Sequence, residues 1–220
     1  MFVSHRHKFI LVHIPRTGGK SMTQVFMPHG SEVIPGQPHR HMTCLEFRDL
    51  VGRKRWNSYF KFAFVRNPWD RWVSLYRFHT AGLRPGNSYG IWHGNVDMDE
   101  KTLLYRQRTW GSFPQYIGRV TDRYNPYAED DIDWGRHSMT QTEYLLDDSG
   151  NCMVDFVGRF ENLKNDFGLV LKRIGLSLEL PYINASSHSR YVDYYDRETR
   201  MLVKKHSSET IERFGYKYNV

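Results

Sequence analysis

The segment Lys8–Phe26, KFILVHIPRTGGKSMTQVF, decides the fold class of this chain. Its first part, Phe9–Ile14, is mostly apolar and predicts a short buried strand, after which a turn with one proline and two glycines leads into a helix. Such a turn directs backbone N–H groups and the positive end of a helix toward one point, which favours a bound phosphate. We expect the anion to contact six residues that supply glycine amides, cations and hydroxyls: Arg16, Thr17, Gly18, Gly19, Lys20 and Ser21.

This loop differs from the nucleoside-triphosphate loop G-x-x-x-x-G-K-[ST] at a decisive position. Gly19, Lys20 and Ser21 supply the last three residues, but Ile14 stands where the first glycine is required. The acidic candidate for organising magnesium, Asp155, lies inside an apolar run rather than at its end. The pattern therefore predicts a phosphate loop, but not one that hydrolyses ATP.

A second strand–turn–helix unit follows in Phe60–Tyr76, FKFAFVRNPWDRWVSLY. Phe60–Val65 predicts a strand, and Asn67 is expected to cap a helix whose apolar residues pack it onto the sheet. Arg66 stands at the carboxyl end of this strand, where open α/β sheets bind ligands, and Ser74 lies about two turns into the helix. Two cationic turns of this kind predict a ligand with two separated anionic groups.

Together the two units predict an α/β fold of the P-loop-like type, with three layers and a central, mainly parallel sheet flanked by helices. With 220 residues, 40% of them apolar, the chain is expected to form a single domain over residues 1–220. The N-terminal residues lack a signal-peptide core, and no apolar run approaches membrane-spanning length. We therefore expect a cytoplasmic protein without a membrane partner.

The rest of the chain predicts further helices and a hairpin. Thr43–Glu46 fits a capping box that opens a helix through Leu50, and Cys44 and Cys152 are interpreted as buried thiols rather than as a disulfide. Tyr144–Leu146 and Cys152–Val157 are expected to pair as a hairpin. Helices are expected over Asp99–Arg108, Phe113–Val120, Leu163–Ile174 and Asp196–Gly215, and Tyr124–Met139 is expected to be irregular.

The net charge of +7 suits a polyanionic cofactor, an acidic glycan or a nucleic acid. A nucleic-acid-binding module is the weaker interpretation, because basic and aromatic residues form no interleaved stripe. A nucleotide kinase is a second alternative, but it requires magnesium ligands and the glycine that the first loop lacks.

The combination of HIPRTGGKS (His13–Ser21) and FVRNPWDRWVSLY (Phe64–Tyr76) resembles the sulfotransferases that use 3′-phosphoadenosine 5′-phosphosulfate (PAPS). The nearer likeness is to their carbohydrate O-sulfotransferase branch, which includes heparan sulfate 2-O-sulfotransferase and its bacterial relatives. It extends to His39–Leu50, Met139–Leu146 and Val157–Phe167, and so runs through most of the chain.

This resemblance implies the cofactor and its contacts. The first loop is expected to hold the 5′-phosphosulfate, and Arg66 and Ser74 the 3′-phosphate, so that adenosine 3′,5′-bisphosphate is the product. The resemblance also implies that a loop near the C-terminus closes over the cofactor, with Ser187 and Arg190 as its binding residues.

Sulfuryl transfer needs a general base for the acceptor hydroxyl and positive charge on the leaving oxygen. The family's H-x-H motif aligns with His39 and His41, which implies that His41 is the base and that His39 binds substrate or substitutes for it. The family loop usually reads PKTGGTS; here Arg16 replaces the lysine and is expected to stabilise the bridge oxygen, and Lys20 replaces the threonine. No metal is required. The expected acceptor is a carbohydrate hydroxyl, and a catalytically inactive PAPS-binding homologue remains an alternative.

Overall fold

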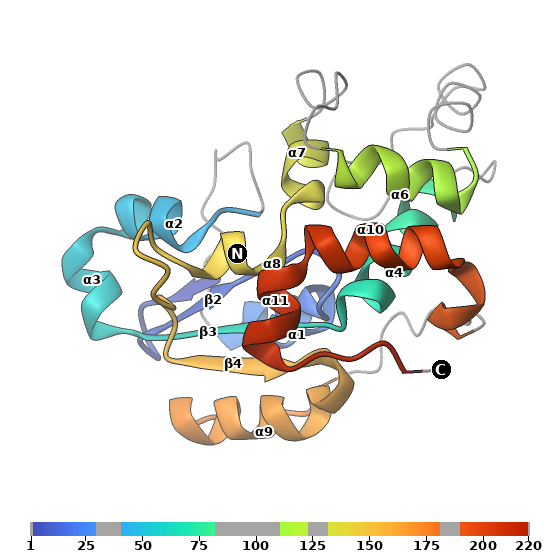
Figure 1. The fold of residues 1–220 in the computed structure, drawn as a ribbon. Coiled ribbons are helices and arrows are strands. Elements are labelled where there is room, and N and C mark those ends of the chain that lie inside the picture. The colour runs from blue at the N-terminus through green and yellow to red at the C-terminus, as the bar shows by residue number, and fades with distance from the viewer. Residues whose placement is uncertain (1, 30–40, 82–110, 123–131, 181–189, 220) are drawn as a thin grey trace, which may run out of the picture.

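The computed structural model describes residues 2–29, 41–81, 111–122, 132–180 and 190–219, and its central element is a four-stranded sheet (Figure 1). The strands lie in the order β1 (Phe2–Ser4), β2 (Phe9–Val12), β3 (Phe60–Val65) and β4 (Phe156–Arg159). β1 is antiparallel to β2, whereas β2 with β3 and β3 with β4 are parallel. The predicted α/β class with a mainly parallel sheet is confirmed.

Helices connect and cover these strands. They are α1 (Gly19–Phe26), α2 (Cys44–Val51), α3 (Arg53–Ser58), α4 (Pro68–Ala81), α6 (Phe113–Thr121), α7 (Ile132–Ser138), α8 (Gln141–Leu145), α9 (Leu163–Ile174), α10 (Arg197–His206) and α11 (Ser208–Phe214). The short 3₁₀ helices are η1 (Met27–His29), η3 (Phe160–Asn162) and η4 (Tyr191–Tyr194). Within the described ranges, no helix combines the length and the apolar character that crossing a membrane requires.

The sheet is buried on both faces. In β3, Ala63 and Val65 belong to an apolar cluster shared with α2, α3 and α8, whereas Phe62 and Phe64 belong to a cluster shared with α1 and α9. Figure 1 shows α2 and α3 on one side of the sheet and α9 on the other. Because parallel strands need apolar cover on both faces, the run FKFAFV contains almost no polar residue.

Local capping signals place several helices where the sequence predicts them. Thr43 and Glu46 form a reciprocal capping box at the start of α2, with the Thr43 N–H donating to Glu46 Oε2 at 2.7 Å. The Asn67 side chain accepts from the Trp69 N–H at 3.1 Å and so caps α4. α9 ends at Gly175, which adopts the left-handed conformation with φ 70°.

The predicted hairpin between Tyr144–Leu146 and Cys152–Val157 is confirmed only at its turn, where Leu146 and Cys152 form an antiparallel bridge. Thr140 and Glu143 form a second capping box, so that the first segment is largely part of α8. A single isolated bridge joins the two segments in the described structure. The end of the second segment instead enters β4, which pairs in parallel with β3.

Two further segments differ from the prediction. The stretch Tyr124–Met139, expected to be irregular, contains α7. The final helix, predicted over Asp196–Gly215, is divided into α10 and α11 by Ser207, whose backbone leaves the helical conformation at φ −102° and ψ 22°. The predicted helix Asp99–Arg108 lies outside the described residues.

The apolar face of α4 packs differently from the expectation. Trp69, Trp72 and Val73 lie in a third apolar cluster with residues of α6 and α10, rather than in either cluster that covers the sheet. The three- and four-residue spacing correctly predicted an apolar face, but this spacing carries no information about the partner of that face.

The two cysteines are free thiols in different environments. Cys44 is buried within the α2 cluster, and burial raises the pKa of its thiol. Cys152 is exposed, so the prediction that both thiols are buried is wrong for this residue.

We expect a methyl group on β4 to destabilise the fold. A Cβ at Gly158 lies 2.4 Å from the Phe64 ring, so Gly158→Ala should lower the free energy of unfolding by about 1–3 kcal/mol through overpacking. Gly168 in α9 is the matched control, because a Cβ there meets nothing within 4 Å and alanine favours a helix by up to about 1 kcal/mol. Urea unfolding measures both changes, and an unchanged stability of Gly158→Ala would contradict this packing.

Candidate active site

The two predicted anion-binding turns meet at one edge of the sheet. β2 and β3 are parallel neighbours, so the chain leaves both strands at the same edge. The Arg16 Nε in the first turn donates to Ser74 Oγ in α4 at 3.0 Å, and Arg66 Nη1 in the second turn donates to the Arg16 carbonyl at 3.2 Å. The structure therefore brings together Arg16, Arg66 and Ser74, as the two-turn interpretation requires.

The first turn is built from residues with special backbone conformations. Gly18 has φ 90° and is the N-cap of α1 without a side-chain cap, while Arg16 also has a positive φ of 69°. The N–H groups of Ser21 and Met22 donate to the Gly18 carbonyl. Within the described residues, the earlier N–H groups of α1 carry no such bond, and they lie at the positive end of its dipole.

Close packing at Gly19 excludes any side chain. A Cβ on Gly19 lies 1.8 Å from His13 Nε2, so only glycine lets α1 begin directly against this ring. The Thr17 hydroxyl donates to the Ile14 carbonyl at 2.9 Å, which closes the turn internally. Lys20 is exposed and Ser21 is buried in the first turn of the helix. This glycine-lined turn with nearby cations fits a phosphate group.

The second turn holds Arg66 in one orientation. Its backbone N–H and carbonyl are both bound by the Gln141 side-chain amide, at 2.8 and 2.7 Å. Its guanidinium pairs with Asp70 at 2.7 Å and stacks on Phe160 with a 4.1 Å separation from the ring centre. Arg66 is only 5% exposed, so an anion that binds it competes with the Asp70 carboxylate.

A buried arginine ties the first turn to the segment before α8. Arg71, on α4, donates to the carbonyls of Pro15 at 3.1 Å, Met139 at 3.1 Å and His137 at 3.2 Å. Burial lowers the pKa of the Arg71 guanidinium, which nevertheless stays charged because arginine titrates far above neutral pH. One side chain of α4 thus holds two other segments at the site, the first turn and residues 137–139.

The predicted base, His41, lies against two other histidines. Its Nδ1 is 3.3 Å from the His13 carbonyl, and its ring centre is 4.8 Å from that of His13 and 5.4 Å from that of His137. Since a carbonyl only accepts, we assign the proton of neutral His41 to Nδ1, which leaves Nε2 as the basic nitrogen. This tautomer is the one that a general base acting through Nε2 requires.

An ion pair fixes the distance between the elements that carry two of these histidines. Arg136 on α7 binds Glu46 on α2 through two parallel contacts of 2.7 and 2.5 Å. The same carboxylate completes the α2 capping box. Because His41 precedes this capping box and His137 follows Arg136, the bidentate pair holds both rings at the site.

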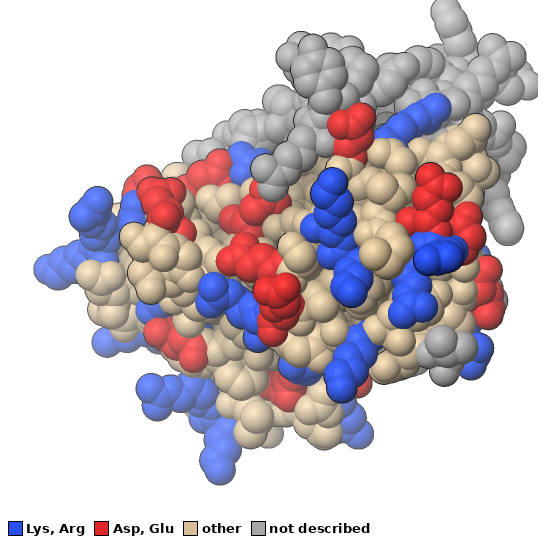
Figure 2. Space-filling model, in the orientation of Figure 1, with Lys and Arg blue, Asp and Glu red and all other residues tan. Residues whose placement is uncertain are grey.

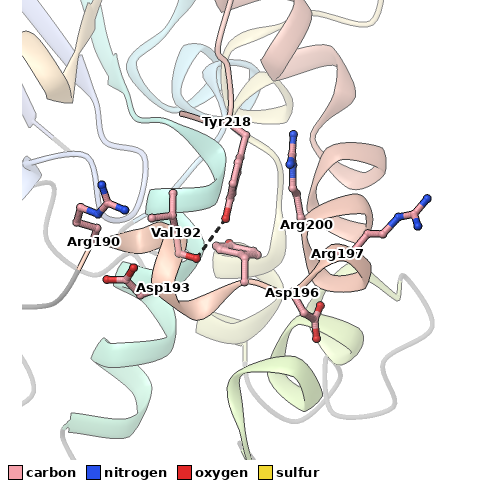
Figure 3. A pocket seen from close by; sticks show the side chains of 8 residues that line it. Arg190, Val192, Asp193, Asp196, Arg197, Arg200 and Tyr218 are labelled. Atoms are coloured by element: carbon pink, nitrogen blue, oxygen red, sulfur yellow. Dashed lines mark hydrogen bonds between the residues drawn. The ribbon is translucent and has the colours of Figure 1, made fainter. Parts of the chain in front are cut away.

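The remaining predicted residues have different outcomes. His39 and Ser187 lie outside the described residues. Arg190 is exposed and lines a pocket of about 410 Å³ with Arg200 and Tyr218, among others (Figure 3). The residues that line this pocket come from η4, α10 and their flanks and from the C-terminal segment, and none belongs to either turn. The described structure therefore does not join Arg190 to the first loop.

Sequence reasoning missed three histidines at this site: His13, His79 and His137. His13 lies within the predicted strand Phe9–Ile14, and a strand prediction assigns it no role in the site. His137 precedes the Thr140 capping box much as His41 precedes the Thr43 one, so a repeated pattern marks it. His79 lies on α4 with no local signal.

The shifted histidine pKa values predict how stability depends on pH. Burial, followed by neighbouring histidines, lowers the pKa of His13 and His137 well below 6.5. The unfolded chain therefore binds more protons than the folded chain once the pH falls below about 6.5. The free energy of unfolding should fall between about pH 6.5 and 5, by up to about 1.4 kcal/mol per pH unit for each histidine.

Urea unfolding at a series of pH values measures this slope. His137→Asn should flatten it, whereas His7→Gln, on the β1–β2 turn at the opposite end of β2, should leave it unchanged. A stability that stays constant from pH 7 to pH 5 would contradict the burial of neutral histidines.

Comparison with known proteins adds independent information. A model of the sulfotransferase family matches residues 1–217. Human carbohydrate sulfotransferase 8 is 27% identical over 226 residues, which cover 93% of this chain and 48% of the relative. Carbohydrate sulfotransferase 10 of Pongo abelii is 23% identical over 242 residues, covering 98% and 66%, and an uncharacterized protein of Archaeoglobus fulgidus is 28% identical over 153 residues, covering 68% and 97%.

This chain spans about half the length of the carbohydrate sulfotransferase 8 sequence that it matches. The family match nevertheless covers nearly the whole chain, including both turns and all four histidines of the site. The resemblance to carbohydrate sulfotransferases is thereby confirmed, and the chain belongs to the sulfotransferase family.

Proposed function

We propose that this protein transfers a sulfuryl group from PAPS to a hydroxyl of a carbohydrate and releases adenosine 3′,5′-bisphosphate. The observation that carries this proposal is the contact between the two turns, in which Arg16 bonds Ser74 and Arg66 bonds the Arg16 carbonyl. Two adjacent cationic turns suit one small ligand that carries anionic groups on both sides of a ribose. Family membership and the names of the relatives support sulfuryl transfer and a glycan acceptor.

In this proposal the chain is a P-loop-like fold whose two turns divide the cofactor. The amide groups at the start of α1, with Arg16, Thr17, Lys20 and Ser21, hold the 5′-phosphosulfate. Arg66 and Ser74 hold the 3′-phosphate. The Thr17 hydroxyl turns away from the Ile14 carbonyl to reach the ligand, and Asp70 yields part of its ion pair with Arg66.

His41 acts as the general base. Its Nε2 takes the proton of the acceptor hydroxyl as the new oxygen–sulfur bond forms and the bond from sulfur to the phosphate oxygen breaks. The His13 carbonyl, 3.3 Å from Nδ1, stabilises the imidazolium that results. The Arg16 guanidinium supplies the positive charge for the leaving oxygen. His39, Ser187 and Arg190 keep their predicted roles as proposals.

The structure weakens the alternative of a nucleotide kinase. Asp155, the candidate for organising magnesium, accepts from the Lys61 N–H at 2.7 Å and pairs with Lys61 Nζ at 2.8 Å. Lys61 is near the start of β3, whereas both turns follow strand carboxyl ends, so Asp155 lies at the opposite edge of the sheet. This position does not serve a phosphate in the first turn.

Nucleic-acid binding likewise gains no support on the face shown in Figure 2. Lysine and arginine side chains on this face are interspersed with acidic ones rather than gathered into a stripe. A sequence-independent nucleic-acid interface requires a continuous basic surface along the backbone.

A transfer assay tests the proposed function directly. Labelled sulfate should move from PAPS to at least one member of a glycan panel in the presence of EDTA. Binding of the bisphosphate without any transfer would favour the inactive-homologue alternative. Failure to bind either PAPS or the bisphosphate would contradict the proposal altogether.

The 3′-phosphate contact predicts ligand-specific effects of Ser74→Ala and Arg66→Ala. Loss of a charge-assisted contact costs about 1.5–3 kcal/mol of binding free energy. Both variants should therefore weaken the binding of adenosine 3′,5′-bisphosphate much more than that of adenosine 5′-phosphate, which lacks the 3′-phosphate. Ser74→Ala is the cleaner variant, because Arg66 also anchors the fold through Asp70 and Phe160. If calorimetry showed that the binding of both ligands is weakened equally, the assignment of Arg66 and Ser74 to the 3′-phosphate would be contradicted.

The role of His41 predicts a separation of turnover from binding. His41→Asn keeps a donor near Nδ1 but lacks Nε2, so turnover should fall by about 10²–10⁴ while bisphosphate affinity stays nearly unchanged. The wild-type rate should also fall at acid pH as a single group becomes protonated. A His41→Asn enzyme with normal turnover would transfer the role of base to another residue, with His39 as the first candidate.

A further inference from the structure

A buried hydrogen-bond network of three side chains leads from α6 to the histidines of the site. Tyr116 on α6 places its hydroxyl 3.1 Å from His79 Nδ1, and His79 Nε2 on α4 lies 3.1 Å from His137 Nδ1 on α7. All three side chains are at least nine-tenths buried. The proposed transfer step does not use this hydrogen-bond network.

We assign the direction of these hydrogen bonds from the chemistry of Tyr116. A phenol O–H, with a pKa of about 10, is a good donor to a neutral imidazole nitrogen. When Tyr116 donates to His79 Nδ1, the His79 proton lies on Nε2 and is donated to His137 Nδ1. His137 then carries its own proton on Nε2. The network thereby assigns one tautomer to each ring.

The Nε2 atom of His137 is available to a ligand. In the described part of the chain it has no hydrogen-bond partner, and the sole buried side-chain nitrogen or oxygen without a partner there is Arg119 Nη1. His137 Nε2 therefore reaches solvent, although the residue is only 8% exposed. The ring centres of His137 and His41 are 5.4 Å apart, with the ring planes tilted by 53°, so the His137 ring lies beside the proposed base.

We propose that His137 is a neutral donor whose Nε2–H binds an oxygen of the sulfuryl group during transfer. This inference rests on the proposed function and adds a residue to it. The sulfuryl oxygens only accept hydrogen bonds, whereas the acceptor hydroxyl must present its proton to His41, so a fixed donor matches the first group. His137 keeps its proton throughout, and the proton of the acceptor still passes to His41 Nε2.

The surroundings keep this donor neutral. His79 and His41 face His137 from α4 and from the segment before α2, and Arg71 and Arg16 add positive charge from α4 and the first turn. A second proton on His137 is disfavoured by all of these groups and by burial. The donor therefore does not switch its charge in the pH range where His41 works as a base.

Two amide variants separate the donor from a merely structural role. His137→Gln places an amide N–H near the position of Nε2, whereas His137→Asn places its amide near Nδ1 and retains the bond to His79. The control is His7→Gln, on the β1–β2 turn away from the site. The readouts are the rate of transfer from PAPS, and the ratio of PAPS affinity to adenosine 3′,5′-bisphosphate affinity, since the bisphosphate lacks the sulfuryl group.

His137→Asn should lower the rate by about 10²–10³-fold and the affinity ratio by about tenfold, with unchanged bisphosphate affinity. His137→Gln should stay within about tenfold of the wild type in both. If His137→Asn retained rate and ratio while His137→Gln lost them, His137 would only anchor His79, and the donor role would be overturned. A rise in the KM of the acceptor alone would also overturn it.

The nitrogen NMR spectrum of the free protein gives a readout that needs no activity. His137 should show the Nε2–H tautomer, and the Nδ1–H tautomer would overturn the donor role by itself. A wild type that does not bind PAPS would overturn the proposed function together with this inference. A wild type that binds and transfers normally, with a fully active His137→Asn, would overturn the inference alone.

Discussion

A charged guanidinium buried against three backbone carbonyls holds this site together. Arg71 donates to Pro15, Met139 and His137, and no carboxylate within the described residues forms an ion pair with it. Parallel pairing of β2 with β3 brings the two turns to one edge of the sheet. This pairing does not determine the position of residues 137–139, which precede α8. Removing this cation would leave three buried carbonyl oxygens without a donor, which costs free energy. Arg71 therefore fixes the first turn and residues 137–139 relative to α4. The site depends on this side chain without exposing it to substrate.

The chemistry of the site depends on several histidine rings that lie close together at one edge of the sheet. The His13 carbonyl determines the tautomer that we assign to His41. The Glu46–Arg136 ion pair keeps His41 beside His137. Burial, followed by nearby positive charges, lowers the pKa of His13 and His137, so these rings stay neutral. In the proposed mechanism, His41 is therefore a base surrounded by neutral imidazoles. The cations of the two turns, by contrast, have the proposed role of binding the anionic groups of the ligand.

Much of the fold and part of the site could be predicted from local patterns. The strand–turn–helix units, the Thr43 capping box and the Gly175 helix end are encoded within a few neighbouring residues, and all appear as expected. The predicted hairpin is reduced to one antiparallel bridge, because the Thr140 capping box places most of its first strand in a helix. The contacts of His79 could not be predicted, because 37 and 58 residues separate it from its two partners. Such long-range convergence leaves no periodic signal in the sequence.

The central claim is that the two turns bind two phosphate groups on opposite sides of one ribose. Thermal unfolding in EDTA, with adenosine 3′,5′-bisphosphate compared with adenosine 5′-diphosphate, tests it most directly, because both ligands carry two phosphates and differ in where these are attached. At a hundred times its dissociation constant, the bisphosphate should raise the free energy of unfolding by about 2.7 kcal/mol, and the diphosphate at equal concentration should raise it far less. Equal stabilisation by the two ligands, or stronger stabilisation by ATP with magnesium, would contradict the account.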